Sequence, residues 1–333
     1  MPVAEPENVA KLQKREPAGF LLASLRGVGQ VDFQPLLWTG VLILAALWAA
    51  GWQVGLFATM GTVFATAAAY ALGIDRSSIA LGLQGFSGCL TGIALVVYLG
   101  NHLSTYLLTL VGAVMCTVLN STLTTFLAPY GLKAMTAPFC VVSGVMVIGA
   151  SSYARVWHGT AKTAPDPTYG GPGLTGQDFG HAFLNNFSQV FLVDEWYVGL
   201  IMLVGLACAG WRVALFAAAG SVVGVLVAWA FGAPVAQITN GIYGYNSVLV
   251  AIGMGTVFLT ATAWNTVYTL VAAAAATALT ASLTTLFQPF NGHTFTWPFN
   301  LTTWAFMAAV PFLTRIRSVS GPSGSDRPSS STS

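Results

Sequence analysis

Long, unbroken runs of apolar residues separated by short polar breaks fill most of this chain. They cover 36–50, 53–72, 81–100, 103–127 and 137–153, and then 196–210, 212–231, 240–259, 262–286 and 297–314. A membrane β-strand would alternate apolar and polar positions, so continuous runs predict helices. Because about 20 apolar residues cross the hydrocarbon of a bilayer, we expect an all-α membrane protein with ten transmembrane helices. Shorter semi-polar stretches at 18–34 and 180–193 precede each set, and we expect each to form a re-entrant pore segment.

The second set of runs repeats the first. Residues 40–73 and 199–232, offset by 159, are identical at 15 of 34 positions, which indicates a duplication. Five spans is an odd number, so the second copy must enter the membrane from the opposite side, as an inverted repeat. We therefore predict a first inverted repeat at 18–153, an extracytoplasmic linker at 154–179 and a second inverted repeat at 180–315. Polar ends at 1–17 and 316–333 are expected to be disordered and cytoplasmic.

Composition and charge support membrane insertion and set its direction. The chain is 55% hydrophobic and 7% charged, whereas a soluble domain carries about 25% charged residues. With a cytoplasmic N-terminus, ten of the 12 Lys and Arg residues fall on the inner side, as the positive-inside rule requires. We therefore expect an integral protein of the cell (inner) membrane with both termini cytoplasmic and no cleaved signal peptide. The four cysteines lie in apolar runs and are read as small core residues.

The chain offers no pattern of catalytic, metal-binding or cofactor-binding residues, so we expect neither an enzyme nor a cofactor. Charged residues are almost absent from the predicted span centres, where ion-coupled transporters usually carry them. This favours passage of a neutral solute. Asp32, Asp75, Asp194 and Glu195 flank apolar runs. They are read either as interfacial or helix-start residues or as residues near a pore mouth.

Uncharged polar residues recur at equivalent positions of the two halves. Gln30 matches Gln189, and Thr136 matches Thr296, each threonine two residues before a proline. A single Thr in a membrane helix usually bonds its own backbone, and a single Gln often joins two helices. The paired occurrence, next to sites where helices start or break, instead indicates a cavity lining, because irregular backbone at membrane depth is tolerated there.

These residues carry a resemblance to the urea transporter family, whose repeated signature is Leu-Pro-x-x-Thr-x-Pro-Phe. The chain is similar to that signature at Leu132-Lys133-Ala134-Met135-Thr136-Ala137-Pro138-Phe139 and at Gly292-His293-Thr294-Phe295-Thr296-Trp297-Pro298-Phe299. The Thr-x-Pro-Phe core is intact twice, whereas the leading Leu-Pro is altered in both copies. The resemblance covers about residues 18–315.

The resemblance implies a passive urea channel, usually a homotrimer with a pore along the seam between the halves of each protomer. It places Thr136 and Thr296 at the centre of a flat slot. Its substrate-binding positions would be Gln30, Phe33, Phe86, Leu90, Thr136, Gln189, Val190, Tyr245, Leu249 and Thr296. Urea is planar, neutral and rich in N–H donors, so removing its water is costly unless those donors meet acceptors such as Thr hydroxyls and Gln carbonyls.

Expected partners are urea, close amide analogues and the lipid bilayer, with no nucleic acid. Three alternatives remain open. An ammonium channel would place histidines at mid-membrane and a water channel would carry Asn-Pro-Ala motifs, and the predicted span centres show neither. An ion-coupled secondary transporter of a small amide would depend on an ion gradient. A non-transporting scaffold or receptor is the third alternative.

Overall fold

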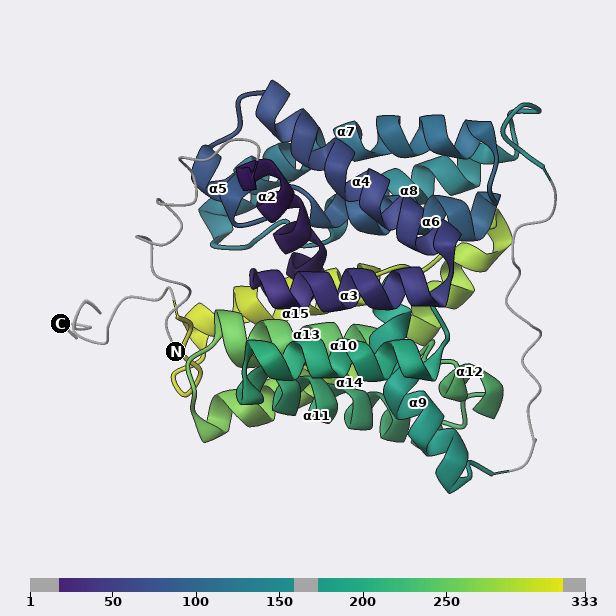
Figure 1. Ribbon diagram of the computed structural model, residues 1–333. Helices are drawn as coiled ribbons and strands as arrows, with labels where there is room; N and C mark the ends of the chain where they lie inside the picture. Colours follow the sequence, from purple (N-terminus) through teal and green to yellow (C-terminus); the bar gives the residue numbers. More distant parts are fainter. Residues whose placement is uncertain (1–17, 159–172, 320–333) are drawn as a thin grey trace.

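The computed structural model describes residues 18–158 and 173–319, and in these ranges the chain is helical apart from turns and one isolated bridge (Figure 1). Residues 1–17 and 320–333, expected to be disordered, and the central linker residues 159–172 lie outside the described part. The bridge joins Leu259 to Ser318. It brings residues 316–319, which we assigned to the tail, against the segment that follows the third run of the second half.

Nine helical elements make up the first half. They are α2 (Ala18–Gly29), η1 (Gln30–Asp32), α3 (Leu37–Ala50), α4 (Trp52–Ala71), α5 (Arg76–Ala80), α6 (Phe86–Leu99), α7 (Leu103–Leu127), η2 (Ala128–Tyr130) and α8 (Ala137–Ala150). The second half follows the same order with two additional elements, η4 and η6. Its elements are α9 (Gly176–Ser188), η3 (Gln189–Phe191), α10 (Trp196–Ala209), α11 (Trp211–Ala230), α12 (Val235–Thr239), α13 (Tyr245–Ile252), η4 (Gly253–Phe258), α14 (Ala263–Phe287), η5 (Gln288–Phe290), α15 (Trp297–Ala309) and η6 (Val310–Phe312). The long helices agree in length, since α4 and α11 have 20 residues and α7 and α14 have 25.

Helices form at all ten predicted runs, but ten full membrane crossings are not confirmed. Within the described ranges four helices are long and apolar enough to cross, at Trp52–Ala71, Leu103–Tyr130, Trp211–Ala230 and Ala263–Phe290. Two further crossings are possible if each bent pair, α2 with α3 (80°) and α9 with α10 (77°), counts as one span. α8 has 14 residues and α15 has 13. At 1.5 Å per residue each is only about 20 Å long.

In each half, the helix formed by the third apolar run is shorter than hydropathy predicts, because a turn interrupts the run. The short helices α5 and α12 are followed by turns at Gly82 (φ 80°) and Gly241 (φ 78°), and the main helix begins only at Phe86 or Tyr245. A left-handed φ favours glycine. In the second half the helix also changes to a π-helical turn at Gly253.

The two halves meet along α3 and α10, which lie side by side at the centre of Figure 1. Thr39, near the start of α3, donates a 3.0 Å hydrogen bond to the carbonyl oxygen of Gly205, near the end of α10. Within each half the bent pair packs closely in the same manner. A Cβ on Gly40 would lie 2.0 Å from the carbonyl oxygen of Leu25, and one on Gly199 would lie 2.0 Å from that of Leu184. Small residues permit such backbone contact in membrane proteins.

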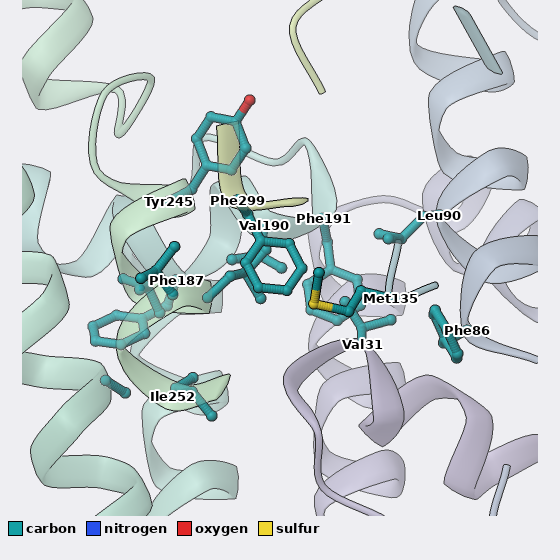
Figure 2. Close-up of a cluster of buried hydrophobic side chains, with 14 of the residues drawn as sticks. Val31, Phe86, Leu90, Met135, Phe187, Val190, Phe191, Tyr245, Ile252 and Phe299 are labelled. Carbon is teal, nitrogen blue, oxygen red and sulfur yellow. The ribbon is translucent and has the colours of Figure 1, made fainter. Parts of the chain in front are cut away.

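One hydrophobic cluster of buried side chains draws on both halves and fills the seam (Figure 2). It contains residues from α6 and α13 together with the segments that begin α8 and α15. The polar groups described next lie at this junction.

Candidate functional site

Two threonines from opposite halves touch at the seam. Thr136 and Thr296 are 3% and 1% exposed, and their Oγ1 atoms lie 2.6 Å apart, so one hydroxyl donates to the other. Each immediately precedes a helix, α8 or α15, whose first turn contains a proline. Proline fits that position because the N–H it lacks would have no helical partner there. The structure therefore brings together the two signature residues that the sequence separates by 160 positions.

The backbone just before each threonine is left-handed. Met135 has a φ of 48° and Phe295 a φ of 44°, both unusual for residues with a side chain. In the second half the Phe295 carbonyl accepts the Tyr245 hydroxyl and, at 3.4 Å, the Nδ2 of Asn246. Asn246 also accepts the backbone N–H of Phe299 at 3.1 Å. These contacts hold the start of α15 in place.

The first half lacks the same support. Phe86 stands at the position of Tyr245 and has no hydroxyl. Ser87 stands at the position of Asn246, and its Oγ is buried without a hydrogen-bond partner among the described residues. The two halves thus have a similar backbone here but differ in the hydrogen bonds that hold it.

Two polar side chains flank the threonine contact, those of Cys140 and Asn300. Cys140 Sγ lies 3.1 Å from Thr296 Oγ1. Asn300 Nδ2 donates to Thr136 Oγ1 at 3.0 Å and to the Thr296 carbonyl at 2.9 Å. Both side chains are buried, and each lies four residues after its own threonine, one helical turn further along. This group carries no formal charge, so it can bond a neutral solute without attracting an ion.

The apolar positions that we expected to form slot walls lie around this centre. Phe86, Leu90, Val190, Tyr245 and Leu249 are all buried in the seam cluster. In the view of Figure 2, Tyr245 lies on one side of Phe299, and Phe86 and Leu90 lie on the other. Walls contributed by α6 and α13 therefore belong to a single apolar region around the threonines.

Phe33, the remaining wall position, is only partly buried. Its ring packs edge-on against Phe258 at 5.6 Å and Phe299 at 5.8 Å between ring centroids. Phe33 also has a left-handed φ of 62°, and Leu192, at the equivalent position, has a φ of 60°. The break between the short segment and the next helix is thus built alike in both halves.

The two predicted glutamines occupy equivalent turns but are bonded differently. Gln30 Nε2 donates to the Leu81 carbonyl at 2.8 Å. Gln189 Oε1 is buried and has no hydrogen-bond partner among the described residues. An unpaired buried acceptor is costly, so Gln189 offers a free acceptor for a donor that enters from outside the protein.

The four acidic residues that flank apolar runs separate into different environments. Asp75 is exposed and caps α5 by accepting the Ser78 N–H at 3.0 Å, which is the helix-start role that we considered. Hydrogen bonds from Ser77 and Ser78 lower the pKa of Asp75 below its ordinary value. Asp194 and Glu195 are exposed at the start of α10. Asp32 differs from them because it is buried, with 3% of its surface exposed.

Sequence reasoning missed several polar residues of this site, chiefly Cys140, Asn246 and Asn300. The signal was present, because Cys140 and Asn300 occupy equivalent positions four residues after the threonines. Their chemical difference hides the relationship, because a thiol and a carboxamide do not form an obvious matched pair.

Comparison with known proteins covers most of the described chain. The family model described as "Urea transporter" matches residues 21–311. The Urea transporter 1 proteins of Capra hircus and Ovis aries are each 30% identical over 291 residues, which is 85% of this chain and 75% of each relative. That of Rattus norvegicus is 29% identical over the same length and shares.

Proposed function

Because this chain belongs to the urea transporter family, we propose that it is a passive channel through which urea diffuses down its gradient along the seam between the two halves. The protein is an integral membrane protein and belongs to a family of transporters, not of enzymes. The observation that carries the proposal is the buried Thr136–Thr296 contact inside an apolar region built from both halves.

The chemistry of the seam suits urea. A planar solute can stack on the aromatic faces of Phe33, Phe86 and Tyr245, which replaces part of the contact that it loses with water. Its N–H groups need acceptors once water is removed. Thr136, Thr296 and the free Oε1 of Gln189 supply them. Several weak binding sites in a row allow a solute to bind and leave again.

The distance between the two threonine hydroxyls constrains where they can lie in the slot. A solute cannot pass between two oxygens that lie 2.6 Å apart. We therefore infer that both hydroxyls belong to one edge of the slot, with the aromatic and aliphatic side chains forming its faces. A cation would find no charged partner among the central side chains, and its dehydration would be uncompensated.

The finer architecture is proposed on the same basis. The pairing of the start of α3 with the end of α10 and the equal helix lengths support two inverted repeats. The positive-inside count supports cytoplasmic termini in the inner membrane. A homotrimer and the transport of close amide analogues remain predictions from the family resemblance.

Stopped-flow urea flux into proteoliposomes tests this function. We expect the protein to accelerate urea entry equally with and without proton or sodium gradients, close amides to compete, and sugars to remain excluded. Flux no faster than in protein-free vesicles, or flux that requires an ion gradient, would overturn the proposal.

A variant pair tests the site within the same assay. Thr136→Val combined with Thr296→Val removes both central hydroxyls and should lower urea flux strongly. Thr122→Val is the matched control, because Thr122 is exposed on α7 and bonds only the Val118 carbonyl of its own helix. If the double variant conducts as well as the control, the threonines do not form the filter.

A further inference from the structure

Cys140 and Asn300 break the symmetry of the seam at its centre. The two residues occupy equivalent positions, offset by 160, and both contact the threonine pair. Cys140 carries a thiol, which is a weak hydrogen-bond donor, whereas Asn300 carries a carboxamide with two strong N–H donors. The two threonines are chemically identical, so this difference decides how their hydroxyl protons are arranged.

The orientation of the Asn300 carboxamide follows from its neighbours. The Thr296 carbonyl oxygen can only accept, so the amide must turn its nitrogen, and not its oxygen, toward that carbonyl. The second N–H of the same nitrogen then faces Thr136 Oγ1 at 3.0 Å. The amide oxygen remains buried without a partner among the described residues. Thr136 Oγ1 is thereby fixed as an acceptor toward Asn300.

Two arrangements of the hydroxyl protons remain. In the first, Thr136 donates to Thr296 and Thr296 donates to Cys140. In the second, Cys140 donates to Thr296 and Thr296 donates to Thr136, whose oxygen then accepts twice and whose own proton has no partner. The first arrangement satisfies both hydroxyl protons and leaves only the thiol proton, the weakest donor of the group, unpaired. It is therefore the more stable one.

We propose that Asn300 is a positioning residue that directs the hydrogen bonds through the threonine pair so that both hydroxyl oxygens present a free lone pair to the solute. In the favoured arrangement each oxygen accepts one hydrogen bond and donates one, which leaves one acceptor site on each. A solute with N–H groups meets two acceptors side by side. This inference rests on the proposed function, because it specifies how the channel recognises the N–H groups of urea.

A variant and its control test the proposal through transport. Asn300→Leu removes both N–H donors at similar volume, and we expect urea permeability to fall about two- to tenfold, as the loss of one oriented hydrogen bond implies. Acetamide, which has one amino group and not two, should lose less, so the urea-to-acetamide ratio should fall. Thr303→Val is the matched control, because Thr303 is buried in α15 without a hydrogen-bond partner among the described residues.

A swap across the seam separates this role from simple packing. Asn300→Cys should lower urea permeability. The double variant Cys140→Asn with Asn300→Cys should restore it to within about twofold of the wild type, because one carboxamide again contacts the threonine pair. The Asn300→Cys variant also serves if Asn300→Leu does not fold. Unchanged urea permeability and ratio in the single variants, or no recovery in a folded double variant, would overturn the proposal.

A stability cycle provides a readout that does not depend on conduction. The melting-temperature shifts of Thr136→Val, Asn300→Leu and the double variant should be non-additive, because both single changes remove the same bond. If the wild type conducts no urea, the proposed function fails while the cycle still reports the bond. Additive shifts would show that Asn300 does not hold Thr136, and the inference would then be wrong.

Discussion

Replacing the two central threonines one at a time should destabilise the protein unequally, although the two occupy equivalent positions. Both Thr136→Val and Thr296→Val remove the hydroxyl-to-hydroxyl bond of 2.6 Å. Thr136→Val also removes the acceptor of an Asn300 N–H, which donates to Thr136 Oγ1 at 3.0 Å. Thr296→Val removes the weak contact with Cys140 and the acceptor of the Thr136 hydroxyl, whose proton can rotate. It leaves both acceptors of Asn300 in place, Thr136 Oγ1 and the backbone carbonyl of residue 296.

The magnitude of the difference follows from the stranded donor. A buried N–H without a partner costs about 1–3 kcal/mol. We expect the lower part of that range, because Cys140 Sγ lies 3.6 Å from Asn300 Nδ2 and remains as a weak acceptor. In domains of 150–250 residues each kcal/mol shifts the melting temperature by about 2–4 °C. Thr136→Val should therefore melt a few degrees below Thr296→Val.

Thermal unfolding of the purified protein in detergent, followed by intrinsic fluorescence, measures this difference. Thr122→Val should melt close to the wild type, because its hydroxyl bonds only the backbone of its own exposed helix. Equal melting temperatures for Thr136→Val and Thr296→Val, or a lower value for Thr296→Val, would refute the assignment of Asn300 as a donor to Thr136.

Three further outcomes are expected. Gly40→Ala places a Cβ 2.0 Å from the Leu25 carbonyl oxygen and should abolish folded protein in size-exclusion chromatography, whereas Gly144→Ala, with no atom within 4 Å, should be tolerated; recovery of folded Gly40→Ala would contradict the packing. Asp75 has a lowered pKa, so its stabilising effect is present above the unfolded carboxyl pKa and is lost as the pH falls through the folded value. Asp75→Ala should therefore lower the melting temperature near pH 7 and have less effect in acid; an equal effect at both pH values would refute this. Asp32→Asn should leave urea flux independent of proton gradients and near the wild-type rate, whereas loss of flux with intact folding would favour a coupled mechanism in which this buried carboxyl carries the proton.

Parts of the candidate site could be predicted from the sequence because both halves of the chain carry the same local signals. The Thr-x-Pro-Phe core marks a helix start in both halves, and the structure places Thr136 and Thr296 directly before α8 and α15. The contact of Cys140 and Asn300 with those threonines could not be read in the same way. It depends on which side chains two helices bring within about 3 Å across the seam, and no local pattern encodes that distance.

Hydropathy also overestimated the third helix of each half. Residues 81–100 read as one span, but the chain turns at Gly82 and α6 begins only at Phe86. A Cβ on Gly82 would lie 2.5 Å from the backbone of Arg26. Close contact with a segment more than 50 residues away therefore requires a glycine at this turn, and hydropathy does not register that contact.

The amino-acid sequence by itself determined that this is a helical membrane protein and predicted a duplicated plan, because apolar run length, charge placement and internal similarity are properties of the chain alone. The tertiary structure decided where each helix begins and ends, which glutamine keeps a free acceptor and which amide contacts the threonine pair. Those features depend on donors, acceptors and backbone brought together from distant positions, and a hydrogen bond exists only where two such groups meet.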